Sequence, residues 1–184
     1  EFGGESFGIF QLSGATGGIG RELCEYFAKM GANLLLVDRN PERSQMLARE
    51  LEVAHGTQAE HITLDLEDIT RVREVAKILA EREIDYLVLN AGAYSIPRHK
   101  CDTGYDNVFQ INFATPYYMI RELLPPLRER HGTVVAVGSI AHNYSKIDEN
   151  DVDFHTRTAA SKVYGNAKRY LMFSLYELFR HERE

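Results

Sequence analysis

Cysteine is scarce in this chain, and the two residues present, Cys24 and Cys101, lie far apart. Two scattered thiols cannot form a disulfide framework or the paired clusters of a zinc site. The seven histidines show no spacing typical of metal ligands, such as His-x-x-x-His. We therefore predict no metal, a core position for Cys24, and a reducing, cytoplasmic location.

An excess of basic residues is also absent, because the formal net charge is -6. This balance argues against nucleic acid as a main partner, since no basic face would offset phosphate charge. No run approaches the ~18 apolar residues that a membrane span needs, and no basic-then-apolar leader precedes Phe7. We expect neither a membrane span nor a nucleic-acid interface.

The 184 residues contain no internal repeat, low-complexity tract or interdomain linker, so we predict one domain over residues 1–184. Strand and helix patterns alternate along it, which is typical of parallel α/β sheets. The predicted strands are 7–12, 33–37, 61–64, 84–89 and 133–137, and the predicted helices are 19–30, 41–55, 69–83, 103–130 and 160–181. We expect the fourth helix to be interrupted near Pro116 or Pro125, and residues 142–157 to form a long loop. The predicted fold class is an α/β Rossmann-type, doubly wound parallel sheet of strand order 3-2-1-4-5.

A glycine-rich loop follows the first predicted strand and reads Ser13-Gly-Ala-Thr-Gly-Gly-Ile-Gly20. A strand that turns into a helix over glycines brings backbone N–H groups and the positive helix end against a diphosphate. Gly14 would allow the tight turn, Gly18 the close approach of a phosphate, and Gly20 the packing of helix on strand. The loop therefore predicts dinucleotide binding by Gly14, Thr16, Gly17, Gly18, Ile19 and Gly20. The alternative is an ordinary glycine-rich turn.

The second predicted strand ends in Val37-Asp38-Arg39. An acidic side chain here accepts hydrogen bonds from the adenosine ribose and repels a 2′-phosphate, so Asp38 favours NAD. An arginine at the same corner can pair with that phosphate, so Arg39 leaves NADP possible. The alternative for both residues is a solvated loop charge.

Further motifs follow the glycine loop, namely Asp65-Leu66, Asn90-Ala91-Gly92, Asn112, Ser139 and Tyr164-x-x-x-Lys168. Through the glycine loop and these motifs, the chain resembles the short-chain dehydrogenase/reductase family from Phe7 to His181. The specificity lies in their order, since each falls at its expected strand end or helix. The resemblance implies an NAD(P)-dependent oxidoreductase acting on an alcohol or carbonyl compound. It also implies that Asp65, Leu66, Asn90, Ala91 and Gly92 line the cofactor site, as do Tyr164 and Lys168; the alternative for the first five is turn chemistry.

Elementary chemistry agrees with the last motif. Tyr164 and Lys168 stand four residues apart and share one helix face. A phenol ordinarily loses its proton near pH ~10, and a nearby ammonium favours the phenolate. We therefore predict Tyr164 as general acid/base, with Lys168 beside it and Ser139 hydrogen-bonded to the substrate oxygen. The alternatives are a core tyrosine, a surface lysine and a turn-capping serine.

The remaining roles come from the resemblance. Lys168 would also bind the nicotinamide ribose, and Asn112 would hold a water that links Lys168 to solvent. The alternative for Asn112 is a backbone cap near a helix irregularity. The sequence Ser139-Ile140-Ala141-His142, followed by a polar insert, is similar to the retinol dehydrogenase-like branch, whose substrates are bulky and apolar. That branch usually has Lys-Leu-Ala where this chain has Lys168-Arg-Tyr.

Two other classes of function remain open. One is a non-catalytic dinucleotide sensor or scaffold, which has no need of the Ser139, Tyr164 and Lys168 set. The other is a nucleotide-sugar epimerase or dehydratase, which Asn112 and the Asn90-Ala-Gly turn disfavour.

Members of the resembled family continue beyond their last matching helix, whereas this sequence stops at Glu184. We therefore expect the C-terminal strands and substrate loop to be missing and the fifth strand to lie at a bare sheet edge. The last helix is apolar on most sides, and Phe109, Phe113, Tyr117 and Tyr118 of the preceding helix offer a second apolar surface. By resemblance these helices would form a homodimer or a larger assembly. The alternative is that the missing C-terminal part covers these residues within one chain.

Overall fold

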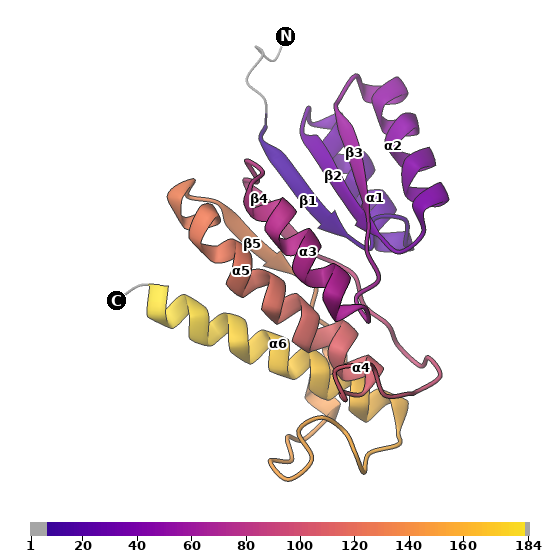
Figure 1. Cartoon of the computed structure of the whole chain (residues 1–184), viewed down its shortest axis with the longest axis vertical. Coiled ribbons are helices and arrows are strands. Elements are labelled where there is room, and N and C mark those ends of the chain that lie inside the picture. Colours follow the sequence, from indigo (N-terminus) through magenta and orange to yellow (C-terminus); the bar gives the residue numbers. More distant parts are fainter. Residues whose placement is uncertain (1–6, 183–184) are drawn as a thin grey trace.

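The computed structural model describes residues 7–182 and contains one sheet (Figure 1). Its strands are β1 (Ile9–Ser13), β2 (Asn33–Asp38), β3 (Ala59–Thr63), β4 (Tyr86–Leu89) and β5 (Thr133–Ala136). The helical elements are α1 (Gly18–Lys29), α2 (Pro41–His55), α3 (Ile69–Ala80), α4 (Asn107–Phe109), η1 (Gln110–Ala114), α5 (Thr115–Glu129), η2 (Ile140–Tyr144) and α6 (Ala160–Glu182).

All neighbouring strands are parallel, and their order is β3-β2-β1-β4-β5. The predicted fold class and strand order are therefore confirmed. Leu12 of β1 pairs with Leu36 of β2 and Val88 of β4. Because the sheet is parallel, the carboxyl ends of the central strands meet at one edge, where the loops after β1, β2, β3 and β4 gather.

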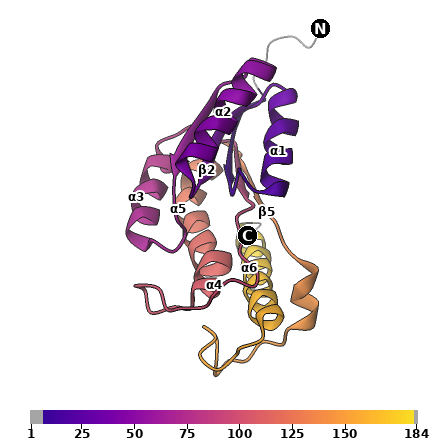
Figure 2. The same cartoon turned by 90° about the vertical axis from the view of Figure 1, so that its right-hand side faces the viewer.

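Helices cover both faces of the sheet, which explains why its inner strands read as continuous apolar runs. On one face α1 and α2 pack over Leu12, Leu34 and Leu36. On the other, α3, α5 and α6 pack over Leu35 and Leu87, and α6 lies alongside α5 (Figures 1 and 2). Cys24 is fully buried on the first face, as predicted, and burial raises the pKa of its thiol to about 12.

Local signals set the helix ends. The Asn40 side chain accepts a hydrogen bond from the Arg43 amide and caps α2, which begins at Pro41 and is followed by Gly56 in the left-handed region. The Asp68 carboxylate caps α3 in the same way. These caps fix the helix N-termini that border the carboxyl edge of the sheet.

The long helix predicted over 103–130 differs in two respects. It begins later, at Asn107, because the Asp106 carboxylate accepts from the amides of Val108 and Phe109 and caps it there. Its irregularity is the π-helical turn η1, which ends just before Pro116 enters the first turn of α5. An interruption at Pro125 is wrong, since Pro125 and Pro126 both lie inside α5.

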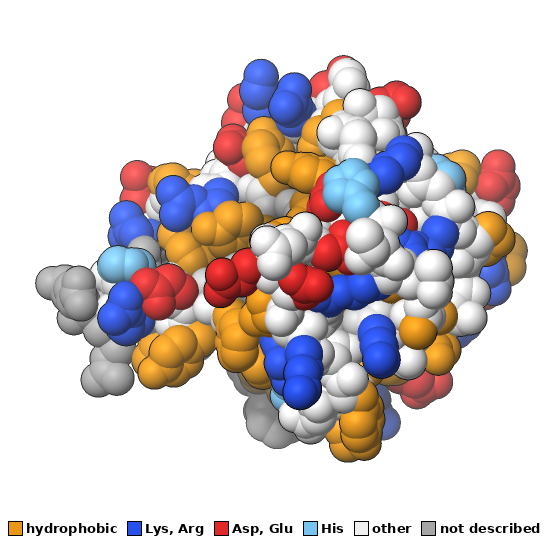
Figure 3. All heavy atoms as spheres, turned by 90° about the horizontal axis from the view of Figure 1, so that it is seen from below, with side chains coloured by type: hydrophobic (Ala, Val, Ile, Leu, Met, Phe, Trp, Pro, Cys, Tyr) orange, Lys and Arg blue, Asp and Glu red, His pale blue; other side chains and the backbone are white. Residues whose placement is uncertain are grey.

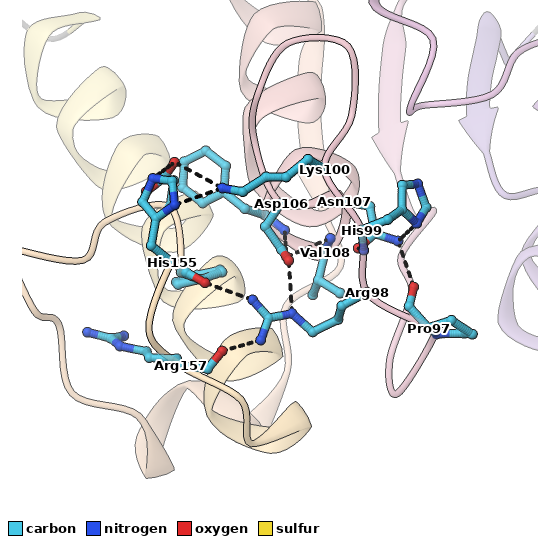
Figure 4. A network of polar contacts seen from close by, with 12 residues as sticks. Pro97, Arg98, His99, Lys100, Asp106, Asn107, Val108, His155 and Arg157 are labelled. Atoms are coloured by element: carbon cyan, nitrogen blue, oxygen red, sulfur yellow. Dashed lines mark hydrogen bonds and ion pairs between the residues drawn. The ribbon is translucent and has the colours of Figure 1, made fainter.

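The predicted loop 142–157 begins with the last turn of η2 and then packs beneath α6. Hydrogen bonds from the Arg98 guanidinium hold it there (Figure 4). Arg98 Nε donates to the Asp106 carboxylate at 2.8 Å and Nη2 donates to the Phe154 carbonyl at 2.8 Å. Its Nη1 donates to the carbonyl of Arg157. Phe154 is buried despite a φ of 68°, so packing holds it in a strained backbone conformation.

The outer faces carry exposed apolar groups. Within the described residues β5 pairs with β4 alone and forms an edge of the sheet, and Val135 on it is exposed. On α6, Leu171, Leu175 and Leu178 pack on the core, whereas Met172, Phe173, Tyr176 and Phe179 are exposed. Phe109 does not join an outer apolar surface as expected, because it is buried against Phe154.

The face seen from below mixes acidic, basic and apolar side chains rather than presenting one sign of charge (Figure 3). Over residues 7–182, no helix combines the length and apolar character that crossing a bilayer would require.

Candidate active site

A cleft of about 770 Å³ opens at the carboxyl edge of the sheet. It is lined by the glycine loop, by the ends of β2, β3 and β4, and by the start of α2. Among the predicted cofactor residues it is lined by Gly14, Thr16, Gly17, Gly18, Ile19, Gly20, Asp38, Arg39, Asp65, Leu66, Asn90, Ala91 and Gly92. The structure therefore brings together residues that span much of the sequence.

The glycine loop is shaped by two glycines with different constraints. Gly14 has a φ of +67°, and a Cβ there would lie 2.8 Å from the Ala91 backbone. A Cβ on Gly20 would collide with the Gly14 carbonyl oxygen. The Asn90 side chain ties the loop to β4 by donating to the carbonyls of Ser13 and Gly14 at 3.1 Å each. Both glycines are thus required by close backbone packing.

The N-terminus of α1 is open toward the cleft. Gly17 is its N-cap and supplies no side-chain hydrogen bond, and the first turn contains no acidic residue. A Cβ on Gly18 would meet nothing within 4 Å. Helix N-terminal N–H groups without a protein partner, at the positive end of the helix, suit a phosphate group.

Asp38 is buried at the end of β2 and binds the loop directly. Its Oδ2 accepts from the Thr16 amide at 2.9 Å and from the Thr16 hydroxyl at 3.0 Å. Its Oδ1 accepts from the Asn40 amide at 3.0 Å. A carboxylate has about four acceptor positions, so Asp38 keeps one after fixing the loop.

Two arginines border the same end of the cleft. Arg39 and Arg43 both line it and both are exposed. Within residues 7–182 neither guanidinium forms an ion pair with a carboxylate. Asp65 also lines the cleft, where its Oδ1 accepts from the Glu67 amide at 2.9 Å, and Leu66 beside it is buried. This end therefore holds groups of both signs.

Lys168, on α6, lies close to the cleft without lining it. Its side chain is buried, and Nζ donates to the carbonyl of Val137, the residue that follows β5, at 3.1 Å. An added Cβ on Gly92 would lie 3.2 Å from Nζ and 2.9 Å from Asn112 Oδ1, so Lys168 stands directly behind a cleft-lining residue. Burial lowers the pKa of Lys168 from 10.5 to about 8.

Tyr164 lies one helical turn before Lys168, whose Nζ is 5.7 Å from the centroid of the phenol ring. The ring packs edge-on against Tyr94, a cleft-lining residue, with 5.3 Å between ring centroids. Tyr164 is partly exposed, not a core side chain. The Tyr164 and Lys168 pair therefore sits beside the Gly92 to Tyr94 end of the cleft.

Ser139 caps the short helix η2, where its Oγ accepts from the Ala141 amide at 3.2 Å. Accepting this bond leaves the hydroxyl proton free to be donated, so the capping role and the catalytic role are compatible. The helix η2 packs against α6 next to Tyr164, because Gly165 lets the Ala141 carbonyl approach. A Cβ on Gly165 would collide with that carbonyl.

The Asn112 side chain is fully buried and clamps the backbone. Its Oδ1 accepts from the Ala93 amide at 3.1 Å, and its Nδ2 donates to the carbonyls of Ala93 and Val108 at 2.9 Å each. Both amide protons are thus used within the protein.

One group of potential metal ligands, Glu67, His99 and Cys101, occurs among the described residues. Asn107 Nδ2 lies 3.2 Å from His99 Nδ1 and can only donate, so Nε2 carries the proton that contacts Glu67 at 2.6 Å. A metal at Nε2 would need the opposite tautomer. Burial and the Glu67 carboxylate also raise the pKa of Cys101 to about 11. The group is a closed hydrogen-bond network, and the absence of a metal remains our prediction.

The profile described as short chain dehydrogenase matches residues 10–149. This chain belongs to the short-chain dehydrogenase family, as its motifs indicated. The match ends before Tyr164 and Lys168, so the hypothesis that these two residues belong to the site depends on their motif and on the geometry described above.

Similar curated proteins include retinol dehydrogenase 13 of Homo sapiens, which is 29% identical over 176 residues. Polyprenol dehydrogenase of Mus musculus is 29% identical over 175 residues. These alignments cover 92% and 91% of this chain but 53% and 52% of the two relatives, so the chain spans about half their length. The expected proximity to retinol dehydrogenases agrees with these matches.

The fold recurs in solved structures. A short-chain dehydrogenase from Sphingobium yanoikuyae in complex with NADPH superposes with a TM-score of 0.78 at 23% identity, covering 94% of this chain and 64% of that one. An alcohol dehydrogenase from Comamonas testosteroni, specific for bulky-bulky ketones, gives 0.77 at 23% identity, with 95% and 67% covered. At this identity the likeness concerns the fold.

Sequence reasoning missed several residues at the site. Ser13 Oγ accepts from the amides of both Asn90 and Ala91 at 3.1 Å, which fixes the turn after β4. Tyr94 connects the cleft to Tyr164, and Arg43 adds a second cation at the far end. Arg43 could have been predicted at the site, because it lies in the first turn of a helix that directly follows the end of a strand.

Proposed function

We propose that the protein is an NAD(P)-dependent oxidoreductase that transfers a hydride between a nicotinamide cofactor and an alcohol or carbonyl compound. The observation that carries this proposal is Lys168, a buried cation placed behind Gly92 and one turn from Tyr164. Desolvating an ammonium is costly, and a purely structural lysine would gain little from it.

The lining residues fit a dinucleotide. The open N-terminus of α1 and the space at Gly18 would hold the diphosphate. Asp38, Arg39, Asp65 and Leu66 would border the adenosine, and Gly92 and Lys168 would border the nicotinamide. When bound, the cofactor supplies the hydride, and the protein supplies position and protons. Asp38 favours NAD, whereas Arg39 and Arg43 are available to a 2′-phosphate.

Protons would pass through Tyr164. In the reducing direction its hydroxyl gives a proton to the carbonyl oxygen, while the Lys168 ammonium stabilises the phenolate that remains. The Ser139 hydroxyl donates a hydrogen bond to the same oxygen and stabilises its developing charge. As the family resemblance implies, Asn112, whose Oδ1 would lie 2.9 Å from a Cβ added at Gly92, would hold a water near Lys168.

Apolar side chains beside these residues favour an apolar substrate. Tyr94 and Ile140 flank Tyr164 and Ser139 and are 58% and 70% exposed. Relatives named as retinol and polyprenol dehydrogenases support the same class of substrate.

We also propose that the protein assembles as a homodimer through the exposed face of α6 at Met172, Phe173 and Tyr176. A monomer in sedimentation at micromolar concentration would contradict this assembly.

The test is turnover by the whole protein that carries this chain, measured as consumption of NADH or NADPH with a panel of apolar aldehydes and ketones. Tyr164→Phe removes one hydroxyl and keeps the ring contact with Tyr94, so we expect ~10²-fold lower kcat with unchanged cofactor affinity. Cofactor binding without turnover on any substrate would instead favour the non-catalytic sensor. An equally active Tyr164→Phe variant would refute the proton-transfer role.

A further inference from the structure

His142 lies three residues after Ser139 and has no role in the chemistry described above. Its Nδ1 is 2.6 Å from the Ser139 carbonyl oxygen, which also accepts from the His142 amide at 3.2 Å. Since a carbonyl oxygen can only accept, Nδ1 must carry the proton. The neutral ring is therefore the Nδ1–H tautomer, and within the described residues its Nε2 makes no hydrogen bond.

We infer that His142 is a positioning residue for Ser139. The imidazole fixes the Ser139 carbonyl, and the Ala141 amide fixes the Ser139 Oγ, so both ends of this residue are held by the same turn. No other side chain within residues 7–182 holds the Ser139 carbonyl. Removing the imidazole leaves that peptide group with only the 3.2 Å amide bond.

The short helix η2, which contains this turn, is held against α6 close to Tyr164. The Ala141 carbonyl rests on Gly165, and the Ser145 Oγ donates to the Lys162 carbonyl at 2.9 Å. A displacement within η2 therefore changes the position of Ser139 relative to Tyr164. Misplacing a reacting group by about 1 Å can cost ~10²-fold in rate, so a positioning bond at this turn has a measurable effect.

The inference rests on the proposed function for its kinetic consequence but not for its structural basis. Long-range ¹H–¹⁵N NMR, at a pH where the imidazole is neutral, reports which ring nitrogen is protonated. We expect protonated Nδ1 for His142, assigned by loss of its signals in His142→Asn. A protonated Nε2 would overturn the inference, whether or not the protein is an active oxidoreductase.

Kinetics on the whole protein complete the test. His142→Phe removes the donor, and we expect kcat to fall about tenfold or more with an unchanged KM for cofactor. His142→Asn places an amide N–H in reach of the same carbonyl and should restore kcat to within about threefold of wild type. The control is Asn143→Ala, an exposed neighbour in the same turn, which should leave kcat unchanged.

An equal loss in His142→Asn and His142→Phe would overturn the positioning role, because it would mean that the imidazole itself takes part in the reaction. Full activity in His142→Phe would also overturn it. An inactive wild type would refute the proposed function instead, while the tautomer measurement would still decide whether the bond to Ser139 exists.

Discussion

Replacing Lys168 by methionine should stabilise the protein while it removes the cation that we propose for catalysis. The Lys168 side chain is buried, and its pKa falls from 10.5 to about 8 because burial disfavours the charged form. At ~1.4 kcal/mol per pKa unit, keeping the ammonium charged in the folded state costs about 3 kcal/mol. Methionine has a similar length and no charge. Losing the hydrogen bond to the Val137 carbonyl offsets about 1 kcal/mol of this gain.

The pH dependence of the stability difference shows whether the buried charge of Lys168 is its cause. Below pH 8 Lys168 is protonated in both the folded and the unfolded chain, so the penalty is fully present. Between pH 8 and 10.5 the unfolded chain binds more protons than the folded one, and the stability of the wild type rises with pH. The advantage of Lys168→Met should therefore be about 2 kcal/mol at pH 7 and should fall to zero at pH ~10, where the remaining penalty equals the ~1 kcal/mol of the lost hydrogen bond.

Urea unfolding of both proteins at pH 7 and at pH 9.5 measures this difference, since other titrating groups are shared and cancel. The Lys168→Arg variant is the matched control, because it keeps a charge and should show no gain. A destabilised Lys168→Met variant at pH 7, or an advantage that does not change with pH, would refute the account of Lys168 as a desolvated cation.

Two further predictions concern residues on the central strands and the loop. Asp38→Asn keeps an oxygen acceptor for the Asn40 or Thr16 amide but loses the negative charge. The ratio of NADP(H) affinity to NAD(H) affinity should therefore rise by about tenfold. The control, Thr16→Val, should weaken the binding of NAD(H) and NADP(H) equally. Tighter binding of NADP(H) by the wild type, measured calorimetrically, would make Arg39 the discriminating residue. Gln11→Met should raise the free energy of unfolding by ~1–2 kcal/mol, because the buried Gln11 amide has no hydrogen-bond partner among the described residues. Lower stability of that variant in urea would show that the amide is satisfied.

The sequence was sufficient for the sheet because its signals are local and repeated. Apolar runs at β2 and β4, each followed by a turn and a helix, admit few arrangements other than a parallel sheet with β1 at its centre. Asp38 and the glycine loop line the same cleft because they lie at strand ends, which meet at one edge.

Other features depend on contacts between distant segments and could not be read from local patterns. The bond from Asp38 to Thr16 needs β1 and β2 side by side. The clamp of Asn112 on Ala93 needs the π-helical turn to pack against the loop after β4. The hydrogen bond that Arg98 donates to the Phe154 carbonyl joins two segments far apart in the sequence, and no periodic pattern in the sequence relates them.

The central claim, that the cleft binds a dinucleotide through the N-terminus of α1, is tested most directly by Gly18→Val. Apart from its chain neighbours and the backbone of α1, a Cβ at Gly18 meets no protein atom within 4 Å, so the side chain should fill the diphosphate site without disturbing the fold. Calorimetric titration with NADH and NADPH should show binding to the wild type and at least tenfold weaker binding, ~1.4 kcal/mol, to an equally stable variant. Equal affinity in both proteins, or no binding to the wild type, would contradict the account.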